Sequence, residues 1–243
     1  MMRESGRLLA EIIAEVRSEV RVGISPLELD AICHEAIKAR GARPAFLGYD
    51  PGWGPFPNVV CSSRNQQIVH GIPDDLPLVE GDLISLDFGI EYRGYFADSA
   101  FSVYLGEPAD PVQKLLDVTE RALYTAVSRA RPGARLGDIG HSIQTICESE
   151  GLGVVRDFVG HGIGRALHED PAVPNYGKAG TGVLLKPGMC LAIEPMTTLG
   201  DWRTRTLEDR WTVVTADGSL SAHFEHTVLI TESEPEILTR PRA

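Results

Sequence analysis

The chain has 243 residues, and its 34 acidic side chains outnumber its 23 lysines and arginines, which gives a formal charge of −11. This balance argues against DNA, RNA and anionic membranes as partners, because all of them would be repelled. No apolar run is long enough to cross a bilayer, and the N-terminal segment does not have the pattern of a secretory signal, so we expect a cytoplasmic protein. The four cysteines form no CxxC pair, so we expect their thiols to be reduced.

The first forty residues predict two helices. Apolar residues recur at helical spacing between Leu8 and Val20 and form one face of the first helix. The second begins at Ser25, which has the side chain of an N-cap, with Pro26 at the first helical position and Glu28 completing a capping box. We expect this helix to end at Gly41.

Residues 48–57 form a loop that is rich in glycine, proline and aromatic side chains, and strands are expected at 83–90 and 94–105. The same pattern then returns about 110 residues later, beginning with the apolar face that starts at Val118. Glycines bracket the second helix of each half at the same separation. The sequence therefore predicts a duplicated, pseudo-two-fold domain in which each half gives two helices and several strands to a shared sheet.

Four acidic residues lie in or beside segments that otherwise have the pattern of buried strands. Asp87 ends LISLD and Glu194 ends CLAIE, each six residues after a glycine. Asp98 and Glu225 precede apolar strands in YFADSAFSV and HFEHTVLI. A buried carboxylate is costly unless it is paired or bound to a metal.

A buried salt bridge or a capping role is the simpler explanation for any one of these acids. Four of them in symmetric pairs, with no matching basic residues nearby in sequence, instead favour divalent cations held by oxygen and one imidazole. A catalytic zinc usually takes about three protein ligands. Four carboxylates therefore suit a dinuclear centre, in which two ions lie roughly 3.5–4 Å apart.

The histidines divide into several groups. His161 lies between glycines in GHGIGRALHEDP and is the best candidate for the imidazole ligand. His168 follows seven residues later, and His70 is the approximate counterpart in the first half, so both are expected to contact substrate or support the ligands. Strand alternation directs His226 away from the site, whereas His223 shares the face of Glu225 and its role stays open.

Other catalytic motifs are absent from the sequence. The glycines at 160–164 do not fit GxGxxG, because Arg165 stands where the third glycine would be, and no strand–helix unit precedes them. There is no phosphate-binding GKS or GKT loop, and no GxSxG motif or serine or cysteine beside a convincing base. We expect these glycines to permit close approach of backbone and substrate around His161.

A set of ordered motifs resembles methionine aminopeptidases of type I, in peptidase family M24, over essentially the whole chain. The motifs are HGIP at 70–73, LDFG at 86–89, ADSA at 97–100, GHGIGRALHEDPAVPNY at 160–176, LKPGMCLAIEPM at 185–196 and FEHT at 224–227. The resemblance implies an α/β (α+β) pita-bread fold, with a curved antiparallel sheet backed by helices. It also implies one catalytic domain over 1–243, made of halves at about 1–107 and 108–231.

The resemblance further implies two divalent ions as cofactors. Asp87 would chelate one ion, His161 and Glu194 the other, and Asp98 and Glu225 would bridge them. Cobalt, manganese, iron and zinc are all compatible with these ligands, so the sequence does not choose the metal.

The implied reaction is removal of the N-terminal methionine from nascent proteins and peptides, with a preference for a small second residue. A hydroxide bound by both metals would attack the methionine carbonyl. Glu194 is the expected proton shuttle, His168 would stabilise the tetrahedral intermediate, and His70 and His168 would contact the substrate.

The methionine pocket implied by the resemblance is lined by Tyr49, Phe56, Cys61 and Trp211, with His70 at its rim. This sequence departs from the family in two places. Leu167 stands where an aromatic residue is frequent, and residues 50–56 form a longer loop than usual. Both departures concern the shape of the pocket and leave the reaction unchanged.

Three alternatives remain in view. An aminopeptidase P or prolidase shares the five ligands but normally carries a further N-terminal domain. A type II methionine aminopeptidase has a helical insertion between the last two glutamates, and these are only 31 residues apart here, which leaves no room for it. An inactive binding module would have lost ligands. We expect a monomer with peptide or nascent-chain N-termini as its substrate. A transient ribosome contact is compatible with catalysis, whereas DNA and membranes are not expected partners.

Overall fold

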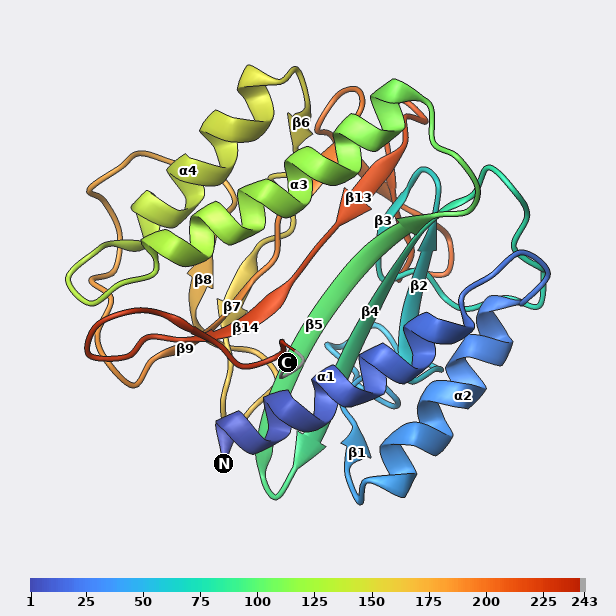
Figure 1. The fold of residues 1–243 in the computed structure, drawn as a ribbon, viewed down its shortest axis with the longest axis horizontal. Coiled ribbons are helices and arrows are strands. Elements are labelled where there is room, and N and C mark those ends of the chain that lie inside the picture. Colours follow the sequence, from blue (N-terminus) through green and yellow to red (C-terminus); the bar gives the residue numbers. More distant parts are fainter. Residues whose placement is uncertain (241–243) are drawn as a thin grey trace.

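Two pairs of helices lie on one side of the strands in the computed structural model, which describes residues 1–240 (Figure 1). The helices are α1 (Met2–Glu19), α2 (Pro26–Ala39), α3 (Asp110–Arg129) and α4 (Leu136–Ser149). The second helix begins as expected: Ser25 Oγ accepts the backbone N–H of Glu28 at 3.2 Å, and the Glu28 carboxylate accepts that of Ser25 at 2.8 Å. The predicted capping box is therefore present.

The first half builds a sheet around one long strand. Its strands are β1 (Arg43–Pro44), β2 (Val60–Arg64), β3 (Gln67–Val69), β4 (Leu83–Tyr92) and β5 (Tyr95–Tyr104). Strand β4 pairs antiparallel with β5 along one edge and with β1 and β2 along the other. The two strands expected at 83–90 and 94–105 are thus confirmed, and β4 runs two residues further because β5 pairs with it as far as Tyr92.

The second half has shorter strands. They are β6 (Gly153–Val154), β7 (Gly160–Gly162), β8 (Glu169–Val173), β9 (Cys190–Ile193), β10 (Met196–Thr198), β11 (Thr204–Thr206), β12 (Val213–Thr215), β13 (Ser221–His223), β14 (His226–Leu229) and β15 (Glu236–Ile237). Five of them form a sheet in the order β15-β14-β9-β7-β8. The others form two three-stranded sheets, β13-β10-β6 and β11-β12-β3, and the second of these includes β3 from the first half.

The two halves meet where β5 lies beside β14. Backbone bonds join Ala100 and Glu225 in both directions, with N···O distances of 3.4 and 3.0 Å. Asp98 and Glu225 are therefore brought together from opposite halves of the chain by the backbone itself. The pseudo-symmetric arrangement of helices behind antiparallel strands follows the expectation from the sequence (Figure 1), but the single shared sheet that was expected is divided into several sheets that meet at this junction.

One large apolar core fills the space between helices and strands. It contains Leu9 and Ile12 of α1, Ala122 of α3, and strand residues such as Leu86 and Ile193, all fully or almost fully buried. A second, smaller apolar cluster lies apart from this core and includes Phe56 and Trp211. The large core holds the sheet rigidly, which is the condition for placing ligands accurately on its other face.

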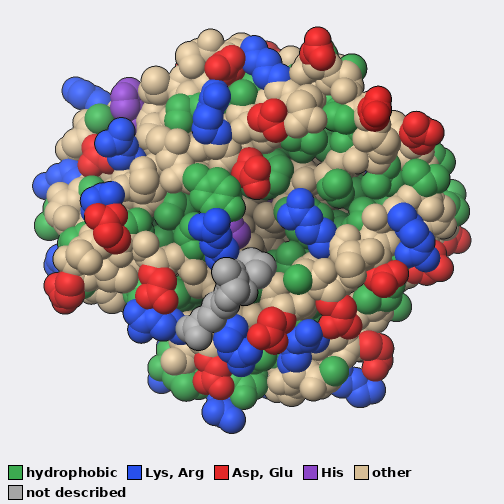
Figure 2. All heavy atoms as spheres, viewed as in Figure 1, with side chains coloured by type: hydrophobic (Ala, Val, Ile, Leu, Met, Phe, Trp, Pro, Cys, Tyr) green, Lys and Arg blue, Asp and Glu red, His purple; other side chains and the backbone are tan. Residues whose placement is uncertain are grey.

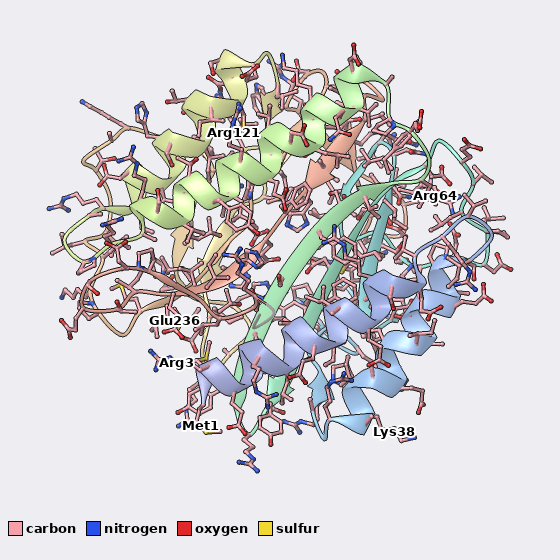
Figure 3. The ribbon with its side chains drawn as sticks, viewed as in Figure 1. Met1, Arg3, Lys38, Arg64, Arg121 and Glu236 are labelled. Atoms are coloured by element: carbon pink, nitrogen blue, oxygen red, sulfur yellow. The ribbon has the colours of Figure 1, made fainter. Side chains whose placement is uncertain are left out.

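The helical face carries acidic and basic side chains side by side (Figure 2). At the start of α1, Arg3 lies next to Glu236, with Nη2 and Oε2 2.7 Å apart, and on α3 Arg121 lies 3.1 Å from Glu150 (Figure 3). Among the described residues, no helix is both long enough and apolar enough to span a membrane. The ion pairs Arg3–Glu236 and Arg121–Glu150 add little to the stability of the fold, because water and salt screen charges at the surface.

Candidate metal centre and active site

The four acids singled out from the sequence converge with His161 on one cavity of about 220 Å³. Asp87 comes from β4 and Asp98 from β5, while Glu194 directly follows β9 and Glu225 directly precedes β14. His161 is the central residue of β7. Residues far apart in the chain, from both halves, thus form a single cluster.

The ligand atoms of this cluster are close enough to share cations. One ligand atom each from Asp98, His161 and Glu225 lie within 4.8 Å of one another. The Nε2 atom of His161 is 3.7 Å from Glu194 Oε1 and 3.9 Å from Asp98 Oδ2. These separations are too long for hydrogen bonds and suit atoms arranged around an ion.

The carboxylates lack the partners that burial requires. In the part of the chain that the structure describes, none of the four pairs with a lysine or arginine, and one oxygen each of Asp87, Asp98 and Glu225 is buried without a hydrogen bond. Burial raises the pKa of Asp87 to about 7 and raises the pKa values of Asp98, Glu194 and Glu225 well above their ordinary range. A divalent cation would stabilise these ionised groups, so the residues present fit a metal centre.

His161 is arranged as a neutral ligand. Its Nδ1 is 2.8 Å from the carbonyl oxygen of Gly162, and a carbonyl can only accept, so Nδ1 carries the proton. Burial lowers the pKa of His161 to about 4, with a further contribution from His168. The lone pair on Nε2 is therefore free to bind a metal at neutral pH.

Hydrogen bonds from neighbouring residues fix the two acids at the junction of the halves. The Thr227 hydroxyl accepts the backbone N–H of Asp98 at 3.0 Å and donates to the carbonyl oxygen of Asp98 at 2.8 Å. The Ser99 hydroxyl donates to the backbone carbonyl of Glu225 at 2.7 Å. Each junction strand thus holds the backbone of the acid on the other strand.

Replacing Thr227 by valine is expected to weaken Mn²⁺ binding about tenfold, because residues that orient ligands typically contribute 10–100-fold to affinity. Thr227→Ser keeps the hydroxyl and should stay within about threefold of the wild type by the same argument. Isothermal titration of Mn²⁺ into the metal-free proteins measures both. Equal affinities for the valine and serine variants would show that the hydroxyl does not position Asp98.

His168 and His70 both line the same cavity. The Nδ1 atom of His168 is 2.9 Å from the Tyr49 hydroxyl, and its ring centre is 4.4 Å from that of His161. His70 has a left-handed backbone with φ of 57°, and its ring lies edge-on to Trp211 at 6.2 Å. Burial lowers the pKa of both imidazoles, to about 4 for His70, so both are neutral near pH 7.

The apolar side of the cavity contains all four residues expected for a methionine pocket. Tyr49, Phe56, Cys61 and Trp211 line it together with Leu167, which is only 4% exposed. The leucine that stands where the family often has an aromatic residue is therefore part of the wall. The structure adds Phe46, Pro51 and Trp53, which the sequence did not single out.

His223 is the residue beside the acids that the sequence left open. It is buried, and its Nε2 lies 3.8 Å from Glu194 Oε2 and 3.9 Å from Glu225 Oε2. The sequence carries a signal for this position, because His223 and Glu225 are two residues apart and strand alternation places such residues on the same face. His226 points away as expected, because its Nδ1 is 2.9 Å from the Thr239 hydroxyl.

The glycines of GHGIG are required by neighbouring backbone. A Cβ on Gly160 would lie 2.3 Å from the carbonyl oxygen of Ala192, and one on Gly162 would lie 2.3 Å from that of Asp170. Close approach of backbone was expected here, and the structure identifies its source as strands β8 and β9. The glycines thus let three strands pack tightly around His161.

Comparison with known proteins agrees with this geometry. The profile described as metallopeptidase family M24 matches residues 1–232. The chain belongs to this family. Among its M24 relatives, methionine aminopeptidase 1 of Bacillus subtilis is 49% identical over 99% of this chain and 95% of its own length. The methionine aminopeptidase of Clostridium perfringens is 46% identical over 98% and 94% of the two chains.

Solved M24 structures share the fold. The methionine aminopeptidase of Thermotoga maritima superposes with a TM-score of 0.93 at 45% identity and covers 98% of this chain and 94% of that one. A prolidase from Pyrococcus furiosus gives a TM-score of 0.77 at 22% identity, and the match covers only 63% of that chain. The resemblance inferred from the motifs and the pita-bread fold are both confirmed, and the prolidase likeness shows the fold alone.

Proposed function

We propose that this M24 peptidase removes the N-terminal methionine from peptides and nascent proteins. The observation that carries the proposal is one cavity that combines a buried cluster of four carboxylates and a neutral imidazole with an apolar, aromatic wall. Such a cavity can hold a polar reacting group at one side and an unbranched apolar side chain at the other. The relatives that match nearly the full chain bear the name of this activity.

We propose that the metal centre binds two divalent ions. Asp87 would hold one ion, His161 and Glu194 the other, and Asp98 and Glu225 would contact both. Oxygen donors with one imidazole are compatible with cobalt, manganese, iron and zinc. When bound, such ions polarise a carbonyl and make a water molecule more acidic.

The protein's own groups then orient the substrate and move protons. Glu194 lies among the proposed ligands, with its Oε1 3.7 Å from His161 Nε2, so its carboxylate could accept a proton from the attacking water and pass it to the leaving amine. His168, held by the Tyr49 hydroxyl, would donate a hydrogen bond to the developing oxyanion. His70 would contact the peptide from the part of the cavity beside Trp211.

The apolar wall explains selection of the first residue. Phe56, Cys61, Leu167 and Trp211 present carbon and sulfur surface to a cavity of about 220 Å³, which suits a flexible thioether side chain. The free amine would lie against the acids, which favours an exopeptidase. The protein is also proposed to prefer peptides in which the second residue is small.

A peptide panel tests the proposed function. Protein reloaded with Co²⁺ or Mn²⁺ should release methionine from Met-Ala-Ser, act much more slowly on Met-Leu-Ser, and leave Ala-Pro peptides intact. Amino-acid analysis of the products measures all three. Cleavage before proline with Met-Ala-Ser left intact would favour a prolidase-like activity and overturn the assignment.

We also propose that the chain works as one catalytic unit, as a cytoplasmic monomer that meets nascent chains through transient ribosome contact. The junction of β5 and β14 supports a single unit, because each half contributes two of the four acids. Equilibrium sedimentation tests the monomer. Co-sedimentation with translating ribosomes tests the contact.

A further inference from the structure

Trp53 differs from the other aromatic residues of the cavity wall in its exposure. Its side chain is 50% exposed, whereas Phe56 is 2% and Trp211 is 9% exposed. Among the Phe, Tyr and Trp residues that the structure places along this cavity, it alone is largely open to solvent. An exposed tryptophan beside a binding cavity can bury further apolar surface when a ligand occupies the site.

Hydrogen bonds close the loop that carries Trp53 at its base and at its tip. At its base, backbone bonds join Gly48 N to Phe56 O and Phe56 N to Tyr49 O, both at 2.9 Å. At its tip, Asp50 Oδ1 accepts the N–H groups of Gly52 and Gly54 at 2.7 and 3.0 Å. These two glycines have φ of 114° and 117°, which side chains with a Cβ rarely adopt. The loop therefore presents Trp53 in a defined position.

Trp53 continues the aromatic wall outward. Its ring centre lies 5.9 Å from that of Trp211, which in turn contacts Phe56 edge-on at 5.1 Å. Trp211 is itself held in place, because its backbone N–H donates to Asp209 Oδ1 at 2.8 Å. The wall thus runs without a break from the buried Phe56 to the exposed Trp53.

The acid cluster and the aromatic wall of this cavity bind different groups of a substrate, and this determines which group reaches Trp53. Under the proposed function, on which this step rests, the amine and the first carbonyl lie at the acids, so the first side chain extends along the aromatic wall. We propose that Trp53 is a specificity-determining residue that covers the distal end of that side chain. The indole ring of Trp53 makes a favourable contact with a thioether. It can be reached only by an unbranched side chain of about the length of methionine, so it favours such a side chain.

Kinetics on a series of first residues tests this role. Trp53→Ala should raise KM for Met-Ala-Ser about tenfold, from the lost apolar and sulfur–aromatic contact, with kcat within about twofold. The loss in kcat/KM should be somewhat smaller for a norleucine peptide, which lacks the sulfur, and smallest for the shorter norvaline. Trp53→Phe should recover most of the affinity. Leu47→Ala, an exposed change outside the cavity, is the matched control.

A binding measurement provides a readout without turnover. L-Methionine should protect the wild-type protein from acrylamide quenching of its exposed tryptophan fluorescence, and Trp53→Phe should lose this protection. An unchanged KM in Trp53→Ala, or an equal loss for norvaline and methionine peptides, would overturn the role of Trp53. The role would also be overturned if the rise in KM caused by Trp53→Ala varied with the third residue of the peptide rather than with the first. Wild-type protein that releases no methionine from Met-Ala-Ser would instead overturn the proposed function itself.

Discussion

Asp98→Asn is expected to lower kcat/KM for Met-Ala-Ser by roughly three orders of magnitude, because a charged ligand of the proposed centre becomes a neutral amide. Asp98 is 4% exposed, and its Oδ1 is buried without a hydrogen bond among the described residues. Asparagine has nearly the same shape, so the fold should remain. Steady-state kinetics and Mn²⁺ titration on the same preparations measure the two effects.

The matched control is Asp82→Asn, which changes another buried aspartate outside the cavity. Asp82 is 5% exposed, and its carboxylate accepts hydrogen bonds from Asn65 at 3.0 Å and from the backbone of Val79 at 2.9 Å. This variant should unfold at a lower temperature and yet keep its kcat. If Asp98→Asn were as active as Asp82→Asn, Asp98 would have no place in the centre.

Removal of the metal is expected to abolish methionine release and to make stability depend on pH. In the metal-free protein, Asp87 has a pKa of about 7, and burial also raises the pKa values of Asp98, Glu194 and Glu225. The folded state therefore keeps protons that the unfolded chain has lost above about pH 4. The buried histidines oppose this effect below their ordinary pKa of about 6.5, because burial lowers the pKa values of His70, His161 and His223 and the unfolded chain then binds the extra protons. Above about pH 6.5 the folded state binds more protons, so the stability of the metal-free protein should fall as pH rises through 7.

Divalent metal should reverse this dependence, because it binds the ionised carboxylates. At a free Mn²⁺ concentration about 100 times Kd, each bound site adds about 2.7 kcal/mol, which corresponds to a rise in Tm of roughly 5–10 °C for a chain of this length. Calorimetry between pH 6.5 and pH 8, with and without Mn²⁺, measures both the rise in Tm and its dependence on pH. A metal-free Tm that rises with pH over this range would contradict the burial of four uncompensated acids.

The sequence predicted the features that depend on local chemistry or strict periodicity. The capping box of Ser25 and Glu28 needs only residues three apart, and the helical faces of both halves follow from apolar spacing. The four acids were recognisable because each interrupts or precedes an apolar strand, where a lone carboxylate is costly. Those same positions converge in the structure.

Features that depend on tertiary contacts were beyond local patterns. The short strands of the second half are defined by pairing with distant segments, as when β12 pairs with β3, rather than by long alternating runs. The role of His223 stayed open because alternation gives a face but not the identity of its neighbours. The sequence pattern does not distinguish Trp53, because the course of its loop depends on Asp50 Oδ1 accepting two glycine N–H groups.

Bound metal and methionine release can be followed in the same titration, which tests whether the metal centre performs the reaction. Metal-free protein receives Mn²⁺ in steps, equilibrium dialysis counts the ions bound, and product analysis with Met-Ala-Ser gives the rate. Two ions should bind per chain at saturation, and methionine release should appear as the ions bind and disappear on chelation. Saturation with metal without methionine release, or full activity after complete chelation, would contradict this role of the metal centre.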